Sequence, residues 1–320
     1  MLSNRLIRTA LLVLSLGAFC ACGKESGSQK KETETADLLV CSFNIRYPEP
    51  ADGDYIWDNR KDAVCKFILT RKPDIIAMQE VEKVQAEYIL KKVGDEYGLY
   101  GIGRDTGKNI LESTTDETSK TILYRKDRFS LAGKGTFWHS DNPNQVMAKN
   151  GSNDFGSFHL THRNVTGWLK LVDEEKMGRT VWVFDTHFQN NKNCTDAAGK
   201  RMLQTNLHLQ MVPEIIGGPI GSSCKDAVIL AGDFNAVFSS DELQRLRNVP
   251  LGYAREDAER SSHRSTVTDN GFGHPGNIID HIFFCGPLKC LNYSVDKRDY
   301  GILYISDHYP ILSEFSYTDK

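Results

Sequence analysis

Long apolar runs, zinc-type cysteine pairs and excess positive charge are all missing from this sequence of 320 residues. The apolar run TALLVLSLGAF at 9–19 is shorter than the roughly 20 residues that span a bilayer. None of the 8 cysteines forms a CxxC pair with zinc spacing, and 42 acidic residues outnumber 39 Lys and Arg. These absences argue against a membrane-spanning protein, a zinc-finger domain and a protein that binds long nucleic acid through broad positive charge.

The N-terminus has the pattern of an export signal. Arg5 and Arg8 precede the short apolar run, and CACG follows it before a polar stretch that has no large apolar side chain. We expect acylation of Cys22, because small Ala21 precedes it; an ordinary secreted protein cleaved nearby is the alternative. The expected organisation is a lipoprotein signal peptide (1–21), a flexible tether (22–36) and one folded domain (37–320).

Export would leave an acidic domain on a lipid anchor. Removing residues 1–21 takes away two arginines and no acids, so the formal charge changes from −3 to −5. An acylated Cys22 would hold the domain on a bacterial membrane without spanning it, facing the periplasm or the cell surface. No protein partner is indicated.

The remaining cysteines permit disulfides in an oxidising compartment. Cys194 and Cys224 flank one predicted helix and are the preferred pair. Cys285 and Cys290 bracket GPLK, which is typical of a hairpin, and could also pair. Cys41 lies in an apolar strand, where we expect it to pack as a small hydrophobic side chain.

Short apolar strands alternate with amphipathic helices after residue 37. Later strand runs follow one another without intervening helices, which indicates antiparallel pairing and argues against a fully parallel sheet. Two packed β-sheets, each covered by helices, would explain both features. The main strands are predicted at 38–44, 74–81, 121–125, 129–138, 165–172, 180–188, 227–235, 278–284, 291–296 and 310–316, and the main helices at 57–72, 83–93 and 197–212.

Polar side chains stand at the ends of several predicted strands. Each one alone is typical of a turn or a solvated charge. Together they combine hard oxygen ligands, which suit Mg²⁺ or Mn²⁺, with histidines beside carboxylates, which suit proton transfer. Hydrolysis of a phosphate ester needs this assortment. The residues are Asn44, Glu80, His187, Asp233, Asn235, Asp280, Asp307 and His308.

Six motifs carry a resemblance to a known family: CSFNIRY, PDIIAMQEV, FDTHF, AGDFNA, IDHIFF and SDHYP, in this order. The sequence resembles the endonuclease/exonuclease/phosphatase family, whose members are similar to pancreatic deoxyribonuclease. It looks most similar to a bacterial branch with YIWDNRK, GTFWHSDNP and VTGWLKL. The resemblance covers residue 37 onward and implies a four-layer α/β sandwich of two packed mixed β-sheets flanked by helices.

The resemblance also implies roles for the polar residues. Asn44 and Glu80 would hold the metal ion, and Asp307 would support that site. His187 would contact the phosphate, Asp233 would orient or deprotonate the attacking water, and Asn235 would fix the phosphate or that water. Asp280 would hold His308, which would transfer a proton.

The substrate stays open at this level. A nuclease would use basic and aromatic groups such as Arg46, Tyr47 and Lys192, whereas a small phosphate ester suits the acidic domain at least as well. A sphingomyelinase is disfavoured because the CGPLKC turn has no aromatic residue. The loop 103–118, which contains Arg104, is expected to lie on the surface. The alternative from another class is a catalytically inactive lipoprotein that binds a ligand on the same scaffold.

Overall fold

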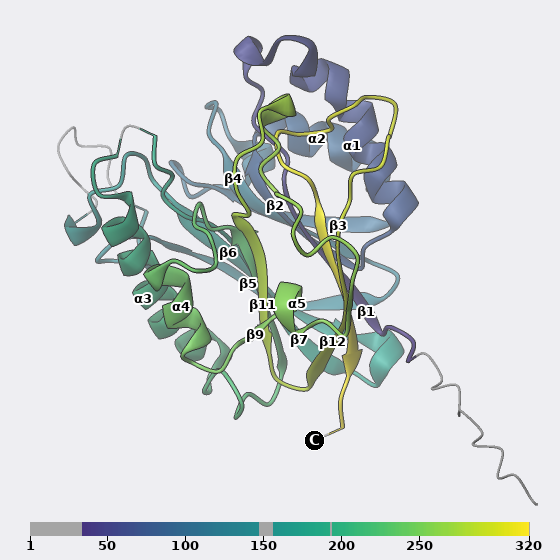
Figure 1. Ribbon diagram of the computed structural model, residues 1–320, viewed down its shortest axis with the longest axis vertical. Coiled ribbons are helices and arrows are strands. Elements are labelled where there is room, and N and C mark those ends of the chain that lie inside the picture. The colour runs from purple at the N-terminus through teal and green to yellow at the C-terminus, as the bar shows by residue number, and fades with distance from the viewer. Residues whose placement is uncertain (1–33, 147–155, 193, 320) are drawn as a thin grey trace, which may run out of the picture. The chain divides into compact units, whose positions relative to one another are not determined.

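The computed structural model describes residues 34–146, 156–192 and 194–319, which belong to one compact unit that begins at Glu34. The predicted signal peptide and Cys22 lie outside these residues. Two mixed β-sheets pack face to face, and helices cover both outer faces (Figure 1). This confirms the predicted layered α/β fold. No helix in the described ranges is long and apolar enough to cross a membrane.

The first sheet, sheet A, contains seven strands within the described residues. Their order is β10 (Arg260–Ser261), β12 (Leu288–Val295), β13 (Ile311–Tyr317), β1 (Leu38–Asn44), β2 (Ile75–Val81), β4 (Ser119–Arg125) and β3 (Tyr97–Gly103). β1 pairs in parallel with β2 and antiparallel with β13. The carboxyl ends of β1 and β2 therefore meet the amino end of β13 at one edge.

In the part of the chain that the structure describes, the second sheet, sheet B, contains six strands. Their order is β5 (Phe129–Trp138), β6 (Val165–Asp173), β7 (Arg179–His187), β8 (Ala227–Asp233), β11 (Asp280–Cys285) and β9 (Gly252–Tyr253). β7 and β8 are parallel, and β11 runs antiparallel to β8. Sheet B thus also gathers two carboxyl ends and one amino end at a single edge.

Helices shield the outer face of each sheet. α1 (Trp57–Arg71) and α2 (Lys83–Val93) lie on sheet A, and α3 (Ala197–Ile216) and α4 (Asp241–Arg247) lie on sheet B (Figure 1). α5 (Ala254–Asp257) is a single turn. A capping box between Glu82 and Gln85 starts α2, and left-handed Lys72 ends α1. Short 3-10 helices lie at Pro50–Tyr55, Ile110–Glu112, Gly156–Phe158, Glu174–Lys176 and Gly271–Gly273.

Strand residues alternate between two buried faces. Val40 and Ala77 lie in the core between the sheets, whereas their neighbours Cys41 and Met78 lie in the core beneath α1 and α2. Because both faces are buried, the central strands are continuous apolar runs in the sequence. Cys41 packs as a small hydrophobic side chain, as predicted.

The predicted hairpin at GPLK is wrong, and so are both predicted disulfides. β11 belongs to sheet B and β12 to sheet A, so the GPLK segment carries the chain from one sheet to the other. Cys285 faces the core beneath α3, whereas Cys290 faces the core between the sheets and has a free thiol. Cys194 also has a free thiol, and the Cys224 thiol donates to the Asp226 carbonyl at 3.2 Å.

Candidate active site

The core between the sheets becomes polar at one edge. On β8, Ala231 belongs to the apolar layer, and Asp233, two residues further along the same face, ends the strand. His187 on β7 and Asp280 on β11 pair with Asp233 on either side. Asn44 ends β1 opposite them in sheet A. The alternation of the strands therefore brings predicted site residues from both sheets into one buried cluster.

His308 is held between two carboxylates. Its Nδ1 lies 2.8 Å from Asp280 Oδ2, and its Nε2 lies 3.7 Å from Asp233 Oδ2. Burial opposes a charge on the ring, but the attraction of Asp280, Asp233 and Asp307 outweighs burial and holds the pKa of His308 well above its ordinary value. Burial, aided by the charge of Asp280, raises the pKa of Asp233 to about 7. His308 and Asp233 are therefore suited to proton exchange near neutral pH.

Glu80 is turned into the cluster by a break in its strand. Its left-handed φ of 62° lies where the pairing of β2 with β4 shifts register between Met78 and Val81. Without this bulge, Glu80 would point toward α2, because Gln79 already faces the other sheet. Asn44 Nδ2 donates to Glu80 Oε1 and to Asp233 Oδ2, at 3.1 Å each. Asn44 thus positions both carboxylates.

Glu80 and Asp307 fit a hard divalent cation. Burial, and then repulsion by the Glu80 charge, raises the pKa of Asp307 to about 6. A divalent ion bound by both oxygens would relieve this repulsion. Arg46 lies on the same side, with its Nε 3.7 Å from Asp307 Oδ2.

A second carboxylate and histidine cluster is less suited to a metal ion. Among the described residues, Asp233, Asp280 and His308 bring potential ligand atoms within 4.8 Å of one another. His308 and Asp280 are already paired with each other through the hydrogen bond between Nδ1 and Oδ2. We therefore interpret this group as a proton-transfer site.

His187 and Asn235 form the opposite wall. His187 Nε2 lies 3.4 Å from Asp233 Oδ2, and burial together with the charge of Lys120 lowers the pKa of His187 well below its ordinary value. Its ring is therefore neutral and acts as a hydrogen-bond partner. Asn235 has a left-handed φ of 50°, its amide N donates to Asp233 Oδ1 at 2.8 Å, and its side chain donates to the Phe188 carbonyl.

The turn at Asn235 corrects one interpretation of the sequence. AGDFN was expected to lie in a strand that continues to Asn235. The strand ends at Asp233, and an Asx-type turn follows. Gly232 is required here, because a Cβ at this position would lie 2.1 Å from the Thr186 carbonyl oxygen on β7.

Arg60 was not identified from the sequence, although it lies in the YIWDNRK motif. This α1 side chain is fully buried, and its Nη1 donates to the carbonyls of Ile45 at 2.8 Å and Ile305 at 2.9 Å. It thereby ties the turn after Asn44 to the loop that carries Asp307. A lone buried arginine gives no periodic signal in a sequence. The only signal that could have identified Arg60 is its position in the YIWDNRK motif.

A polar cavity of about 380 Å³ opens beside Glu80 and His187. The loop 103–118, for which a surface position was the preferred expectation and a contribution to the site the alternative, provides Arg104 and Asp116 to the wall of this cavity. Its lining residues are Tyr47, Glu80, Glu82, Arg104, Asp116, Thr118, His162, His187 and Asn190. A second cavity of about 350 Å³ lies on the Asn235 side and includes Asn191, Arg201 and Asp269.

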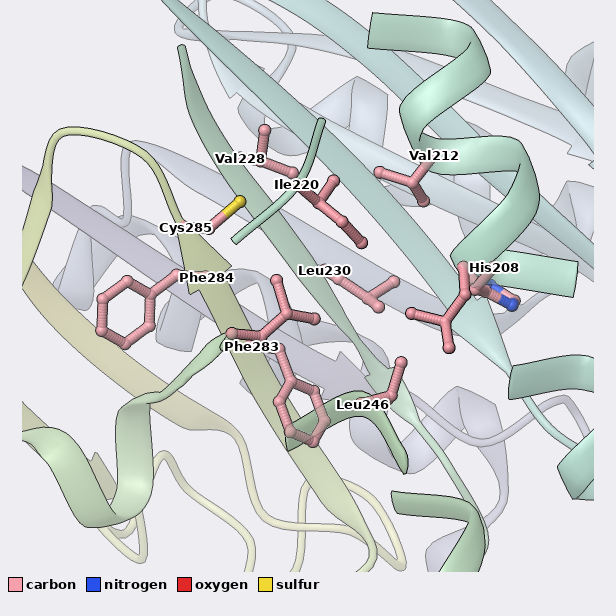
Figure 2. A pocket seen from close by; sticks show the side chains of 11 residues that line it. His208, Val212, Ile220, Val228, Leu230, Leu246, Phe283, Phe284 and Cys285 are labelled. Atoms are coloured by element: carbon pink, nitrogen blue, oxygen red, sulfur yellow. The ribbon is translucent and has the colours of Figure 1, made fainter. Parts of the chain in front are cut away.

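An apolar pocket behind sheet B takes no part in this site. Figure 2 shows side chains from β8, β11 and α3 around it, including Leu230, Phe283 and Val212. Its volume of about 10 Å³ admits at most one water molecule, so it is a packing defect and not a ligand site.

The fold and the buried cluster define a layered α/β hydrolase with a carboxylate and histidine centre. The model of the Endonuclease/Exonuclease/phosphatase family matches residues 41–308, and the chain belongs to this family.

Similar proteins include nucleases and phosphatases. The chain is 26% identical to an endonuclease/exonuclease/phosphatase from Bacteroides vulgatus, with a TM-score of 0.75 over 89% of this chain and 100% of that one. A Bacteroides thetaiotaomicron mannosyl-6-phosphatase shares the fold, with a TM-score of 0.73 at 22% identity over 88% of this chain and 100% of that one. The exoribonuclease subunit Ccr4 of Candida albicans is 24% identical over 89% of this chain, which spans only 42% of that subunit.

Proposed function

We propose that the chain hydrolyses phosphate esters with the help of a divalent metal ion, Mg²⁺ or Mn²⁺. The observation that carries this proposal is the arrangement of Asp280, His308 and Asp233 beside Glu80 and Asp307. A proton-transfer group and a pair of cation-binding carboxylates thereby share one edge of the sandwich. A bound ion would be held by Glu80 and Asp307 and would offset the charge of the phosphate.

Different side chains of the site would have different roles in the proposed hydrolysis. Asp233, with its pKa raised to about 7, is placed to accept a proton from the attacking water. Asp280 binds Nδ1 of His308, so the Nε2–H is free of Asp280, lies on the Asp233 side of the site and is able to protonate a leaving oxygen bound there. Asn44 holds Asp233 and Glu80 in place through its amide N–H groups. Neutral His187 offers a hydrogen bond where charge increases on the phosphoryl oxygens.

A small phosphate ester is the substrate that the site supports best. The cavity of about 380 Å³ is the size of a ligand pocket, not an extended groove. Glu82, Asp116 and Asn190 line it and could accept hydrogen bonds from the hydroxyls of a sugar, while Arg104 could bind an anionic group. The name of the mannosyl-6-phosphatase neighbour agrees with this choice.

A nuclease is the second candidate. The cavity on the Asn235 side continues the site in the other direction and would leave room for a nucleotide on each side of the scissile phosphate. The similarity to Ccr4, an exoribonuclease subunit, favours this function.

Metal-dependent turnover tests the proposal. We expect hydrolysis of p-nitrophenyl phosphate or bis(p-nitrophenyl) phosphate with Mg²⁺ or Mn²⁺, and none with EDTA. A panel of hexose phosphates, inositol phosphates, sphingomyelin, RNA and DNA would then identify the substrate. Lack of turnover on every compound with both ions would favour the inactive ligand-binding lipoprotein.

We also infer export and acylation at Cys22 from the sequence pattern. Metabolic labelling with a palmitate analogue should mark the full chain but not its Cys22→Ser variant. Equal labelling of both would place the lipid on another residue.

A further inference from the structure

A buried lysine lies beneath the candidate active site. Lys120 on β4 is 1% exposed, and its Nζ has no hydrogen-bond partner among the described residues. Burial, and then the nearby charge of Arg104, lowers the pKa of Lys120 to about 8. A buried ammonium without partners is costly, so this position needs an explanation.

Two buried acceptors beside Lys120 also lack partners. Gln79 Nε2 donates to Asp185 Oδ1 at 2.6 Å and so joins β2 of sheet A to β7 of sheet B. Within the part of the chain that the structure describes, Gln79 Oε1 and Asp185 Oδ2 accept no hydrogen bond. All three side chains occupy strand positions that face the space between the sheets.

Gly167 places Lys120 against the same strands. Gly167 on β6 pairs with Asp185, and a Cβ at Gly167 would lie 3.3 Å from the Lys120 carbonyl oxygen and 3.7 Å from its Cβ. The glycine thus lets the stem of Lys120 pass close to β6, next to the Asp185 carboxylate. Burial raises the pKa of Asp185 well above its ordinary value. Its hydrogen bond with Gln79, the charge of Lys120 and the main-chain amides of Thr121 and Met78 oppose this rise, so its carboxyl group lies against β2 and β4.

We propose that a buried water molecule joins Lys120, Gln79 and Asp185, and that Lys120 acts through it as a positioning residue for the active site. One water can accept from Lys120 Nζ and donate to Gln79 Oε1 and Asp185 Oδ2. This satisfies all three unpartnered atoms with the three hydrogen bonds that buried waters usually make.

The water-mediated link between Lys120, Gln79 and Asp185 would affect hydrolysis through two nearby residues of the candidate active site. Glu80 follows Gln79 and turns into the site from that point, and His187 lies two residues after Asp185 on the same face of β7. Holding Gln79 and Asp185 together therefore fixes the distance between the predicted metal ligand Glu80 and the phosphate-contacting His187. Misplacement by about 1 Å can lower a rate by as much as 10²-fold. This role rests on the proposed phosphoesterase function.

Kinetic variants test the positioning role. Lys120→Met removes the donor at similar size and should lower kcat about tenfold while KM changes less than about twofold, because substrate contacts remain. Lys120→Gln keeps an N–H donor and should recover part of the lost kcat. Lys170→Met is the matched control, since Lys170 lies over the Trp182 ring on the outer face of sheet B and should behave as wild type. Unchanged kcat in Lys120→Met, or equal losses in the Met and Gln variants, would overturn the proposal.

Two further measurements stand apart from the substrate question. A double-mutant cycle should show that Lys120→Met combined with Asp185→Asn loses no more kcat than either change alone, because both break one link; additive losses would contradict this. A high-resolution crystal structure should show one ordered water within hydrogen-bond distance of all three side chains. If Lys120 contacts Asp185 directly, the proposed water-mediated link is refuted, even if the enzyme is active. If the wild type contains the water but is inactive, only the proposed phosphoesterase function is refuted.

Discussion

Single residues at the edge of the sandwich have separable roles. His308 is the residue whose surroundings are most specific to proton transfer, since Asp280 fixes its Nδ1 and Asp233 faces its Nε2. The six motifs in register predicted six of these site residues from the sequence, and their roles stay predictions: Glu80, His187, Asp233, Asp280, Asp307 and His308. Asn44 was predicted as a metal ligand, but its amide nitrogen contacts the carboxylates, so direct metal ligation stays a prediction.

Replacing His308 by Ala should lower kcat by roughly 10²-fold or more, the usual scale for losing a proton-transfer group. The fold should persist, as judged by circular dichroism and melting temperature. Steady-state kinetics with bis(p-nitrophenyl) phosphate and saturating Mg²⁺ would measure the effect. His263→Ala is the control, because the His263 side chain is exposed and its ring hydrogen-bonds to the Ser262 hydroxyl. A fully active His308→Ala enzyme would remove His308 from the mechanism.

The charge of Glu80 should determine metal affinity. Glu80→Gln keeps the shape but removes one of the two carboxylate charges that face a bound cation, so the Mg²⁺ concentration for half-maximal activity should rise at least about tenfold. Titration of the apo protein with Mn²⁺ by calorimetry gives the same comparison without substrate. Exposed Glu112→Gln should bind the ion as wild type does. If Glu80→Gln binds the metal ion as tightly as the wild type, then the metal site does not include Glu80.

Features that depend on contacts across the fold could not be predicted at this scale. Arg60 and Lys120 are buried cations, and sequence patterns treat a cation as solvated unless a partner is visible. Arg60 donates to the main-chain carbonyls of Ile45 and Ile305, the second of them far away along the chain. Lys120 is buried between the two sheets, and its Nζ has no hydrogen-bond partner among the described residues. The left-handed conformations of Glu80 and Asn235 are likewise imposed by the surrounding packing, since neither residue type demands them.

Helices and strands were predicted well where the apolar pattern in the sequence was long, and poorly where that pattern was weak. The helix expected at 83–93 has the bounds of α2, and the strand expected at 38–44 has those of β1. β3 was missed because its sequence YGLYGIG contains glycines that weaken a strand signal. The sheet-to-sheet crossing after Cys285 was missed because a Gly-Pro segment between two strands is also typical of a hairpin.

The loop 103–118 is shaped by one buried carboxylate. Glu117 accepts from the main-chain N–H groups of Asp105 and Thr106 and from the hydroxyls of Thr106 and Ser113, at 2.6–2.9 Å. Burial opposes its charge, but these donors outweigh burial and lower the pKa of Glu117. This anchor holds the loop whose first residue after β3 is Arg104, on the wall of the cavity.

Glu117→Gln should therefore loosen the loop without unfolding the domain. Losing charge-assisted hydrogen bonds of about 1.5–3 kcal/mol each should speed hydrogen exchange in residues 104–116 and raise KM several-fold, with a smaller change in kcat. Exchange measured by mass spectrometry, together with kinetics, would show both effects. Glu112→Gln, in the same loop but exposed, serves as the control. Rapid exchange throughout the domain would mean that Glu117 supports the whole fold and not the loop alone.

The whole molecule combines a predictable order of layers with a polar interior that the sequence did not reveal. Strand runs and helix spacing were enough to predict two sheets covered by helices, because burial on two faces leaves a clear apolar pattern. Histidines inside the layers leave no such pattern. His139 and His208 both hydrogen-bond to Thr166 between sheet B and α3, and His281 lies between Tyr253 and the Ala236 carbonyl.

These interior histidines should make the domain acid-labile. Burial lowers the pKa of His208 and of His281 to about 4, and that of His139 well below its ordinary value, whereas unfolded histidine titrates near pH 6.5. Between these values the unfolded chain binds more protons than the folded one. Stability is therefore full above about pH 6.5 and falls as the pH drops toward 4, by about 2 kcal/mol per histidine between pH 7 and pH 5.

Urea unfolding of the apo protein at pH 7 and at pH 5 would measure this loss. Carboxylates also titrate in acid, so the decisive quantity is the difference in pH dependence between wild type and His281→Gln. The variant should be less stable at pH 7, because its hydrogen bonds to Tyr253 and Ala236 are disturbed, yet it should lose about 2 kcal/mol less on going to pH 5. His263→Gln, a change of an exposed histidine, should keep the wild-type dependence. If His281→Gln also keeps it, then His281 is protonated inside the folded domain, and its burial does not exclude the charge.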